Sequence, residues 1–132
     1  MYTKNIFISH SWNYSERYNS MHLLLNNRLY FNWKNFSVPE TKKFELNTRV
    51  SLENQLKRQI NPTHCVIIIG GMWTNHSDWI QFELDYAYNI GKPILGVRPR
   101  GAKIMPQSII NKSTEVCNWN SDSIVNAIRR IS

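Results

Sequence analysis

The sequence predicts an α/β domain in which helices cover both faces of a parallel sheet. Short apolar runs alternate with segments of helical periodicity along the chain. The run at 64–69, HCVIII, is continuously apolar, as expected for a parallel strand covered on both faces. Turn and stop signals, among them Asn61-Pro62 and Gly70-Gly71, separate the segments. Such alternation predicts βαβ units, and the 132 residues predict a single domain, 1–132.

The first elements are two strands joined by a helix. Residues 4–9, KNIFIS, predict the first strand, and the aromatic residues 30–33 predict the second. Between them, Ser15 is a suitable N-cap for a helix that runs to about Asn27. Four apolar residues of this region lie near helical spacing: Tyr18, Met21, Leu25 and Leu29.

A long connection at 34–47 leads from the second strand to a helix predicted at 48–60. Loops of this length inside compact domains are usually functional or mobile. Phe36 and Phe44 are candidates either to cover a ligand or to join the core. The helix has an imperfect apolar stripe: Val50, Leu52, Leu56 and Ile60.

The C-terminal half continues the alternation after the strand at 64–69. A helix is predicted from Ser77 or Asp78 to Tyr88, and Gly91 is a suitable C-terminal glycine. Residues 94–97, ILGV, predict the next strand.

The last third of the chain predicts one more strand and one more helix. Residues 99–112 are irregular, with room for a short helix, and 114–119, TEVCNW, predict a fifth strand. Ser121 or Asp122 then caps the last helix. That helix has an apolar stripe: Ile124, Val125, Ile128 and Ile131.

Composition argues against several classes of protein. No apolar run approaches the roughly 20 residues that span a bilayer, and the N-terminus lacks the features of a signal peptide, so we expect a cytoplasmic protein. Cys65 and Cys117 lie far apart, Cys65 in the apolar run at 64–69, so reduced thiols are expected. No Cys/His cluster has metal-ligand spacing, which predicts no metal.

The net charge of +7 leaves a weak case for nucleic-acid binding. The lysines and arginines are scattered rather than arranged as a stripe on one helix, which favours a solvated surface. Nucleic-acid binding is therefore a minor alternative, and it predicts a steep salt dependence.

Ligands of parallel α/β sheets bind beyond the carboxyl ends of the strands. The loops expected there are 9–14, 33–47 and 70–77. Trp79 and Glu83 lie in the helix that leaves the last of these loops, four residues apart and on one face.

Glu83 is an unusual residue in so apolar a segment. A buried carboxyl group would have a raised pKa or would need hydrogen-bond donors. Near an electron-poor ribose carbon it would stabilise an oxocarbenium-like transition state. Periodicity alone, however, favours a surface glutamate on the polar side of the helix, beside Gln81 and Asp85.

The first loop, Ser9-His10-Ser11-Trp12, is the second candidate part of a site. It offers donors and acceptors at the expected crevice, and Trp12 could stack on a base. The alternative is a polar loop that merely caps the next helix. A Ser-His nucleophile is disfavoured, because Ser9 and His10 are adjacent and no orienting aspartate is evident.

Other nucleotide-binding classes lack their motifs. The sequence has neither Gly-x-Gly-x-x-Gly nor Gly-x-x-x-x-Gly-Lys-Ser/Thr, which disfavours dinucleotide-binding oxidoreductases and P-loop proteins. A phospho-receiver domain would need an acidic pocket at the strand ends, and HCVIIIGG contains no aspartate.

Two stretches resemble TIR domains. NIFISHSWNY is similar to the opening strand and loop of that family, and SDWIQFEL is similar to its helix motif Ser-x-Trp-Cys-x-x-Glu-Leu. Ser77, Trp79, Glu83 and Leu84 are in register, and Ile80 replaces the family's cysteine. HCVIIIGGMWTNHSDW and GKPILGV resemble the strands and loop around this helix, and the overall resemblance is to the bacterial, Thoeris-type defence branch.

The resemblance implies a flavodoxin-like, three-layer fold with about five parallel strands. It also implies cleavage of the nicotinamide–ribose bond of NAD+, with Glu83 as the catalytic residue and an ADP-ribose-type product, released or cyclised, that a downstream effector senses. Ser9, His10, Ser11, Trp12 and Trp79 would line the pocket. No cofactor is implied beyond NAD+ as substrate, and homo-oligomers are expected on activation.

A non-enzymatic TIR-like module that assembles through the 34–47 loop is the main alternative. A scaffold would not need Glu83 beside Trp79, so these residues favour the enzyme.

Overall fold

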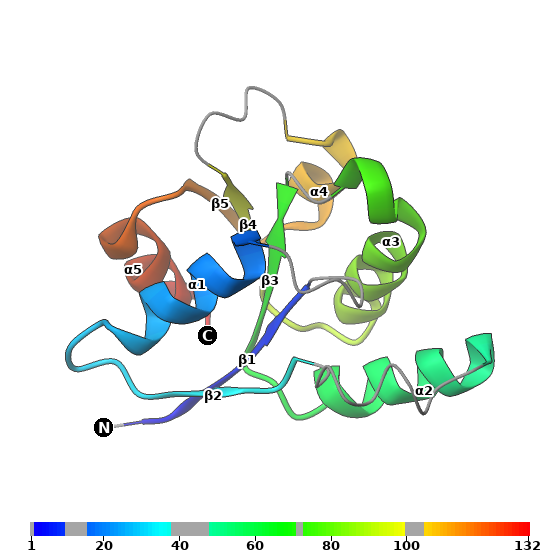
Figure 1. Cartoon of the computed structure of the whole chain (residues 1–132), viewed down its shortest axis with the longest axis horizontal. Coiled ribbons are helices and arrows are strands. Elements are labelled where there is room, and N and C mark those ends of the chain that lie inside the picture. Colours follow the sequence, from blue (N-terminus) through cyan, green and yellow to red (C-terminus); the bar gives the residue numbers. More distant parts are fainter. Residues whose placement is uncertain (1, 10–15, 38–47, 71–72, 100–104) are drawn as a thin grey trace.

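The chain folds into a five-stranded, all-parallel sheet between two layers of helices (Figure 1). This computed structural model describes residues 2–9, 16–37, 48–70, 73–99 and 105–132, with the backbone alone for 73–78. The elements in chain order are β1 (Lys4–Ile8), α1 (Glu16–Asn26), β2 (Trp33–Asn35), α2 (Arg49–Ile60), β3 (Cys65–Ile69), α3 (Trp73–Asn89), β4 (Ile94–Arg98), α4 (Gln107–Lys112), β5 (Glu115–Asn118) and α5 (Ser121–Ile131). The strand order is β2-β1-β3-β4-β5. The predicted α/β fold with its parallel sheet is confirmed.

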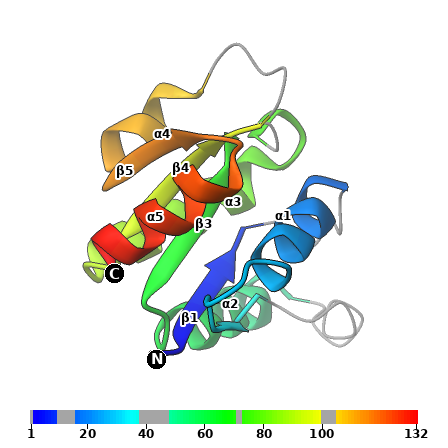
Figure 2. The ribbon, with the colours of Figure 1, turned by 90° about the vertical axis from the view of Figure 1, so that its left-hand side faces the viewer.

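The helices divide between the two faces of the sheet. α1 and α5 lie together on one face, and α2, α3 and α4 cover the other (Figures 1 and 2). From β1 the chain adds β2 on one side, and then β3, β4 and β5 in turn on the other side, so the switch point lies between β1 and β3. These two strands pair in parallel, with Ile6 opposite Cys65 and Ile8 opposite Ile67. In doubly wound sheets ligands bind at such a switch point, beyond the carboxyl ends of the strands.

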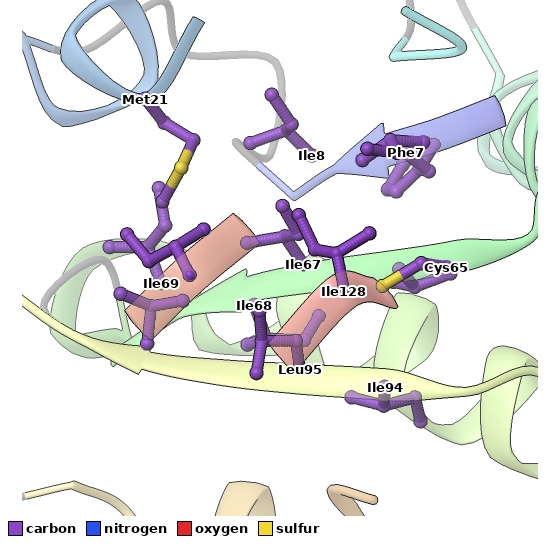
Figure 3. Packing of buried hydrophobic residues seen from close by; sticks show 14 of the residues in the cluster. Phe7, Ile8, Met21, Cys65, Ile67, Ile68, Ile69, Ile94, Leu95 and Ile128 are labelled. Carbon is purple, nitrogen blue, oxygen red and sulfur yellow. The ribbon is translucent and has the colours of Figure 1, made fainter. Parts of the chain in front are cut away.

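The core lies on both sides of β3. All five β3 residues, Cys65–Ile69, are at most 1% exposed, as the continuous apolar run predicts. Figure 3 shows Met21 of α1 and Ile128 of α5 among the side chains that pack against the strands. Both cysteines are free, and burial raises the pKa of Cys65 to about 12, so this thiol stays protonated at neutral pH.

Two predictions in the N-terminal half were wrong: the bounds of the second strand, and the place of Leu29 in the apolar stripe of α1. The second strand is Trp33–Asn35 rather than 30–33, because Tyr30 has a left-handed backbone (φ 60°) and belongs to the turn before it. Phe31 is buried beneath the guanidinium of Arg129, so the aromatic cluster anchors a turn. Leu29 is 77% exposed and lies beyond the end of α1, outside its apolar stripe.

The remaining helices differ at their ends. α3 begins at Trp73, four residues before the predicted start at Ser77, so Glu83 lies in the middle of the helix rather than in its first turns. Asn120 caps α5 by accepting from the backbone N–H of Ser123, in place of Ser121 or Asp122. Val50 of α2 is exposed, because the buried stripe of α2 begins one turn later.

The irregular stretch before β5 contains the short helix for which the sequence left room, at Gln107–Lys112. Among the described residues, no helix has the length and apolar character that a membrane span requires.

Candidate functional site

Glu83 points from α3 into the protein, toward the carboxyl end of β1. Its side chain is 1% exposed, and the hydroxyl of Ser9 donates a hydrogen bond of 2.6 Å to Glu83 Oε1. Within the described part of the chain, the carboxyl group of Glu83 makes this one hydrogen bond. The surface position that periodicity favoured for Glu83 is wrong. Gln81 and Asp85 do form the polar side of α3, where Gln81 donates to Asp85 and Asp85 pairs with Lys112.

Burial controls the protonation of Glu83. Removal of the carboxyl group from water raises its pKa from 4.5 to about 8, and the hydrogen bond from Ser9 offsets part of that rise. At neutral pH the carboxyl group is therefore mostly protonated in the free protein. Any cation that comes to lie beside it will favour its ionised form.

Ser9 is fixed by the sheet itself. It follows β1 directly, its side chain is buried, and its backbone N–H donates to the carbonyl oxygen of Ile67 in β3 at 2.9 Å. Two adjacent strands therefore hold the hydroxyl that contacts Glu83. Such rigid support is what a site requires to keep a functional group in place.

Ser37 and Gln59 extend this support to β2 and α2, and the sequence analysis did not identify them. The hydroxyl of Ser37, just after β2, accepts from the backbone N–H of Ile8 at 3.0 Å. The side-chain amide of Gln59 donates to the carbonyl oxygens of Phe36 and Ser37. Ser37 lies in the segment 34–47 that was predicted to be one long loop, and no local motif marks its role.

Trp79 lies one turn before Glu83 and is partly buried. Its ring and that of Phe82 are T-shaped, with 6.0 Å between centroids, and the guanidinium of Arg49 lies over the Trp79 ring, 4.6 Å from its centroid. Phe36 is partly buried beneath the ammonium group of Lys34.

The structure joins Ser9 and Glu83 through a hydrogen bond and places Trp79 one turn before Glu83 on the same helix. His10, Ser11, Trp12 and Phe44 lie outside the described residues, as does 38–47 of the predicted loop. The described cavities lie elsewhere on the molecule, and none includes Glu83. Among the described residues, no group of three His, Cys, Asp or Glu side chains could hold a metal ion.

Removal of the Ser9 hydroxyl will raise the pKa of Glu83 further. The hydroxyl stabilises the ionised carboxylate, so Ser9→Ala should shift the titration of Glu83 above that of the wild type. The measurement is a carboxyl titration by NMR with ¹³C-labelled glutamate. Ser37→Ala is the matched control, because that buried hydroxyl bonds to β1 backbone instead of Glu83. An unchanged or lowered pKa in Ser9→Ala would contradict the role of this hydrogen bond.

Ser9 and Glu83 lie at the switch point of a parallel α/β sheet, the place where such sheets bind their ligands. A sequence model of the family described as "Thoeris protein ThsB, TIR-like domain" matches residues 7–104, so the chain belongs to this family. No curated protein matches the chain.

One solved structure with a similar fold is that of the Clostridium botulinum CMP N-glycosidase BcmB. The TM-score is 0.60 at 14% sequence identity, and the match covers 96% of this chain and 99% of that chain. At this identity the likeness shows the fold, which extends over nearly the whole length of both proteins.

Proposed function

We propose that this protein is a cytoplasmic enzyme of antiphage defence that cleaves the bond between nicotinamide and ribose in NAD+. The observation that carries the proposal is the position of Glu83, a carboxyl group buried at the switch point of the sheet and hydrogen-bonded by Ser9. Membership of the Thoeris TIR-like family supports it. So does a similar fold in a protein named as an N-glycosidase, an enzyme that breaks a nucleotide's N-glycosidic bond.

The chemistry requires one well-placed negative charge. As the bond between C1′ and nicotinamide nitrogen breaks, its electron pair passes to the pyridinium ring, and nicotinamide leaves as a neutral molecule. Positive charge then develops at C1′ and its ring oxygen. The carboxylate of Glu83 stabilises this charge from a buried position, where electrostatic interactions are stronger than in bulk water. Attack on C1′ by water gives ADP-ribose, and attack by another nucleophile of the same molecule gives a cyclic product.

The raised pKa of Glu83 suits a cationic substrate. Free Glu83 is mostly neutral near pH 7, because burial raises its pKa to about 8. The positive nicotinamide ring lowers that pKa on binding, so the carboxylate forms when the substrate is in place. The hydroxyl of Ser9 then stabilises the new charge through its hydrogen bond to Glu83.

The remaining predicted residues belong to the same proposal. His10, Ser11 and Trp12 continue the chain directly after Ser9, and with Trp79 they would line the pocket around the ribose and nicotinamide. The product, an ADP-ribose or cyclic ADP-ribose signal, would then activate a separate effector protein.

Concentrated protein incubated with NAD+ should release nicotinamide and an ADP-ribose-type product in equal amounts. Chromatography with mass spectrometry measures both, and the mass of the second product distinguishes hydrolysis from cyclisation. Because assembly is expected on activation, the assay should include a crowding agent at high protein concentration. Intact NAD+ after prolonged incubation under these conditions would contradict the proposal.

An assembly module is the second candidate, and the exposed apolar residues of α1 and the following turn favour it. Leu23, Leu29 and Tyr30 are 59%, 77% and 80% exposed, and two neighbouring cavities that share Leu24 open beside them. Such patches often mark interaction surfaces. A pure module would gain no thermal stability from NAD+, whereas a specific ligand raises the melting temperature with the logarithm of its saturation.

A further inference from the structure

Arg49 and Trp79 form a contact that the proposed chemistry at Glu83 does not use. The guanidinium of Arg49 lies 4.6 Å from the centroid of the Trp79 ring, one helical turn before Glu83. Contact with the ring restricts the guanidinium, so less entropy is lost when its donors bind a ligand.

Among the described residues, most donors of Arg49 have no hydrogen-bond acceptor. The Nε–H donates to Glu53 Oε2 at 3.0 Å, and the side chain of Arg49 is 59% exposed. A guanidinium carries five N–H donors. Within the described residues, the ion pair with Glu53 engages one edge of Arg49 and leaves the terminal amino groups free of hydrogen bonds. Those two groups form the planar fork that binds phosphate oxygens in pairs.

The helices that carry Arg49 and Trp79 begin at the edge of the sheet where the strands have their carboxyl ends. Arg49 is the first residue of α2, and Trp79 lies in the second turn of α3. Both helices follow parallel strands, so their N-terminal ends lie beyond the carboxyl ends of β2 and β3, and both cover the same face (Figure 1). Through its contact with Trp79, one turn before Glu83 in α3, Arg49 lies on the same side of the sheet edge as Glu83.

We infer that Arg49 binds a phosphate on the 5′ carbon of the ribose whose N-glycosidic bond is cleaved. The substrates are then nucleotides rather than nucleosides. NAD+ and CMP share this arrangement, in which the anomeric carbon and the 5′-phosphate lie on opposite sides of one ribose ring. The guanidinium of Arg49 contacts Trp79, one helical turn before Glu83, so a carboxyl group and a guanidinium are available for the two ends of such a ring. This inference rests on the proposed function, because Glu83 defines where the anomeric carbon lies.

The inference is tested by binding, without turnover, in the Glu83→Gln protein. Isothermal titration compares nicotinamide mononucleotide with nicotinamide riboside, which differ only in the 5′-phosphate. Hydrogen bonds between charged groups predict that the mononucleotide binds about 10–100-fold more tightly. Adding Arg49→Gln should abolish this advantage while leaving the affinity for the riboside unchanged. Adding Arg49→Lys should retain part of it, because lysine keeps the charge but loses the fork.

Arg130 supplies a matched control. Its side chain is 58% exposed and pairs with Glu115, which is 29% exposed, whereas Arg49 is 59% exposed and pairs with Glu53, which is 28% exposed. Arg130→Gln should leave the preference for the mononucleotide intact. Equal affinities for the two ligands, no binding of either, or a preference that survives Arg49→Gln would overturn the inference. Tight, Arg49-dependent binding of the mononucleotide without nicotinamide release by the wild type would uphold it and refute the proposed function.

Discussion

Replacement of Glu83 by glutamine should lower the rate of nicotinamide release from NAD+ by roughly 10²–10⁴-fold. Glutamine keeps the size of the side chain and its ability to accept from Ser9, but it cannot carry the negative charge that stabilises the oxocarbenium-like transition state. Loss of that charge should lower kcat at saturating NAD+. The measurement is a product time course at saturating NAD+, with circular dichroism to show that the variant is folded.

Asp85→Asn is the control for this substitution. Asp85 lies on the same helix but on its polar side, where it pairs with Lys112 and is more than a third exposed. Its neutralisation should leave kcat unchanged. Equal turnover by wild type and Glu83→Gln would remove Glu83 from the mechanism.

The same substitution should stabilise the fold at neutral pH. Below about pH 4.5 the carboxyl group is protonated in both states and its burial carries no ionic penalty. As the pH rises from 4.5 toward 8, the unfolded chain ionises Glu83 while the folded chain holds it neutral, so wild-type stability declines. Glutamine does not titrate and escapes this decline. Near pH 7 the gain should be on the order of 2–4 kcal/mol.

Urea unfolding at a series of pH values measures this effect. The difference in unfolding free energy between Glu83→Gln and wild type should be small near pH 4.5 and should grow until about pH 8, where it levels off. Asp85→Asn should show no such growth. A difference that stays constant across this range would mean that Glu83 is not titrating with a raised pKa.

These two expectations together distinguish a functional carboxyl group from a structural one. A residue kept for stability should destabilise the protein when its charge is removed, whereas Glu83 should lower activity and raise stability in one change. Active sites commonly carry groups that destabilise the fold.

The sequence was sufficient to predict the architecture, because burial on both faces leaves a clear apolar signal. The apolar run at 64–69 predicts a central strand, and the structure has β3 at Cys65–Ile69. The second strand was misplaced because Tyr30 and Phe31 are residue types common in strands, whereas Tyr30 has a positive φ and belongs to the turn before the strand. The start of α3 was misplaced because Ser77 is a residue type that often caps helices.

The site was only partly predictable, since its contacts join distant parts of the chain. Periodicity placed Glu83 among polar neighbours, and the family motif singled it out, but its hydrogen-bond partner Ser9 lies 74 residues away. The contacts of Ser37 with Ile8 and of Arg49 with Trp79 leave no mark in local sequence. Contacts between side chains of different helices and strands depend on the tertiary arrangement, and the secondary-structure propensity of each residue does not reveal them.

The most direct test of the account is the pH dependence of kcat/KM for nicotinamide release, measured for wild type and Glu83→Gln. For the wild type, kcat/KM should rise with pH, reach half of its maximum near pH 8 and level off above that pH, since it reports the ionisation of Glu83 in the free enzyme. The variant should show no significant turnover at any pH. A wild-type profile that is flat from acid to alkaline pH, or a variant that matches the wild type, would contradict the claim that the buried carboxylate of Glu83 drives the reaction.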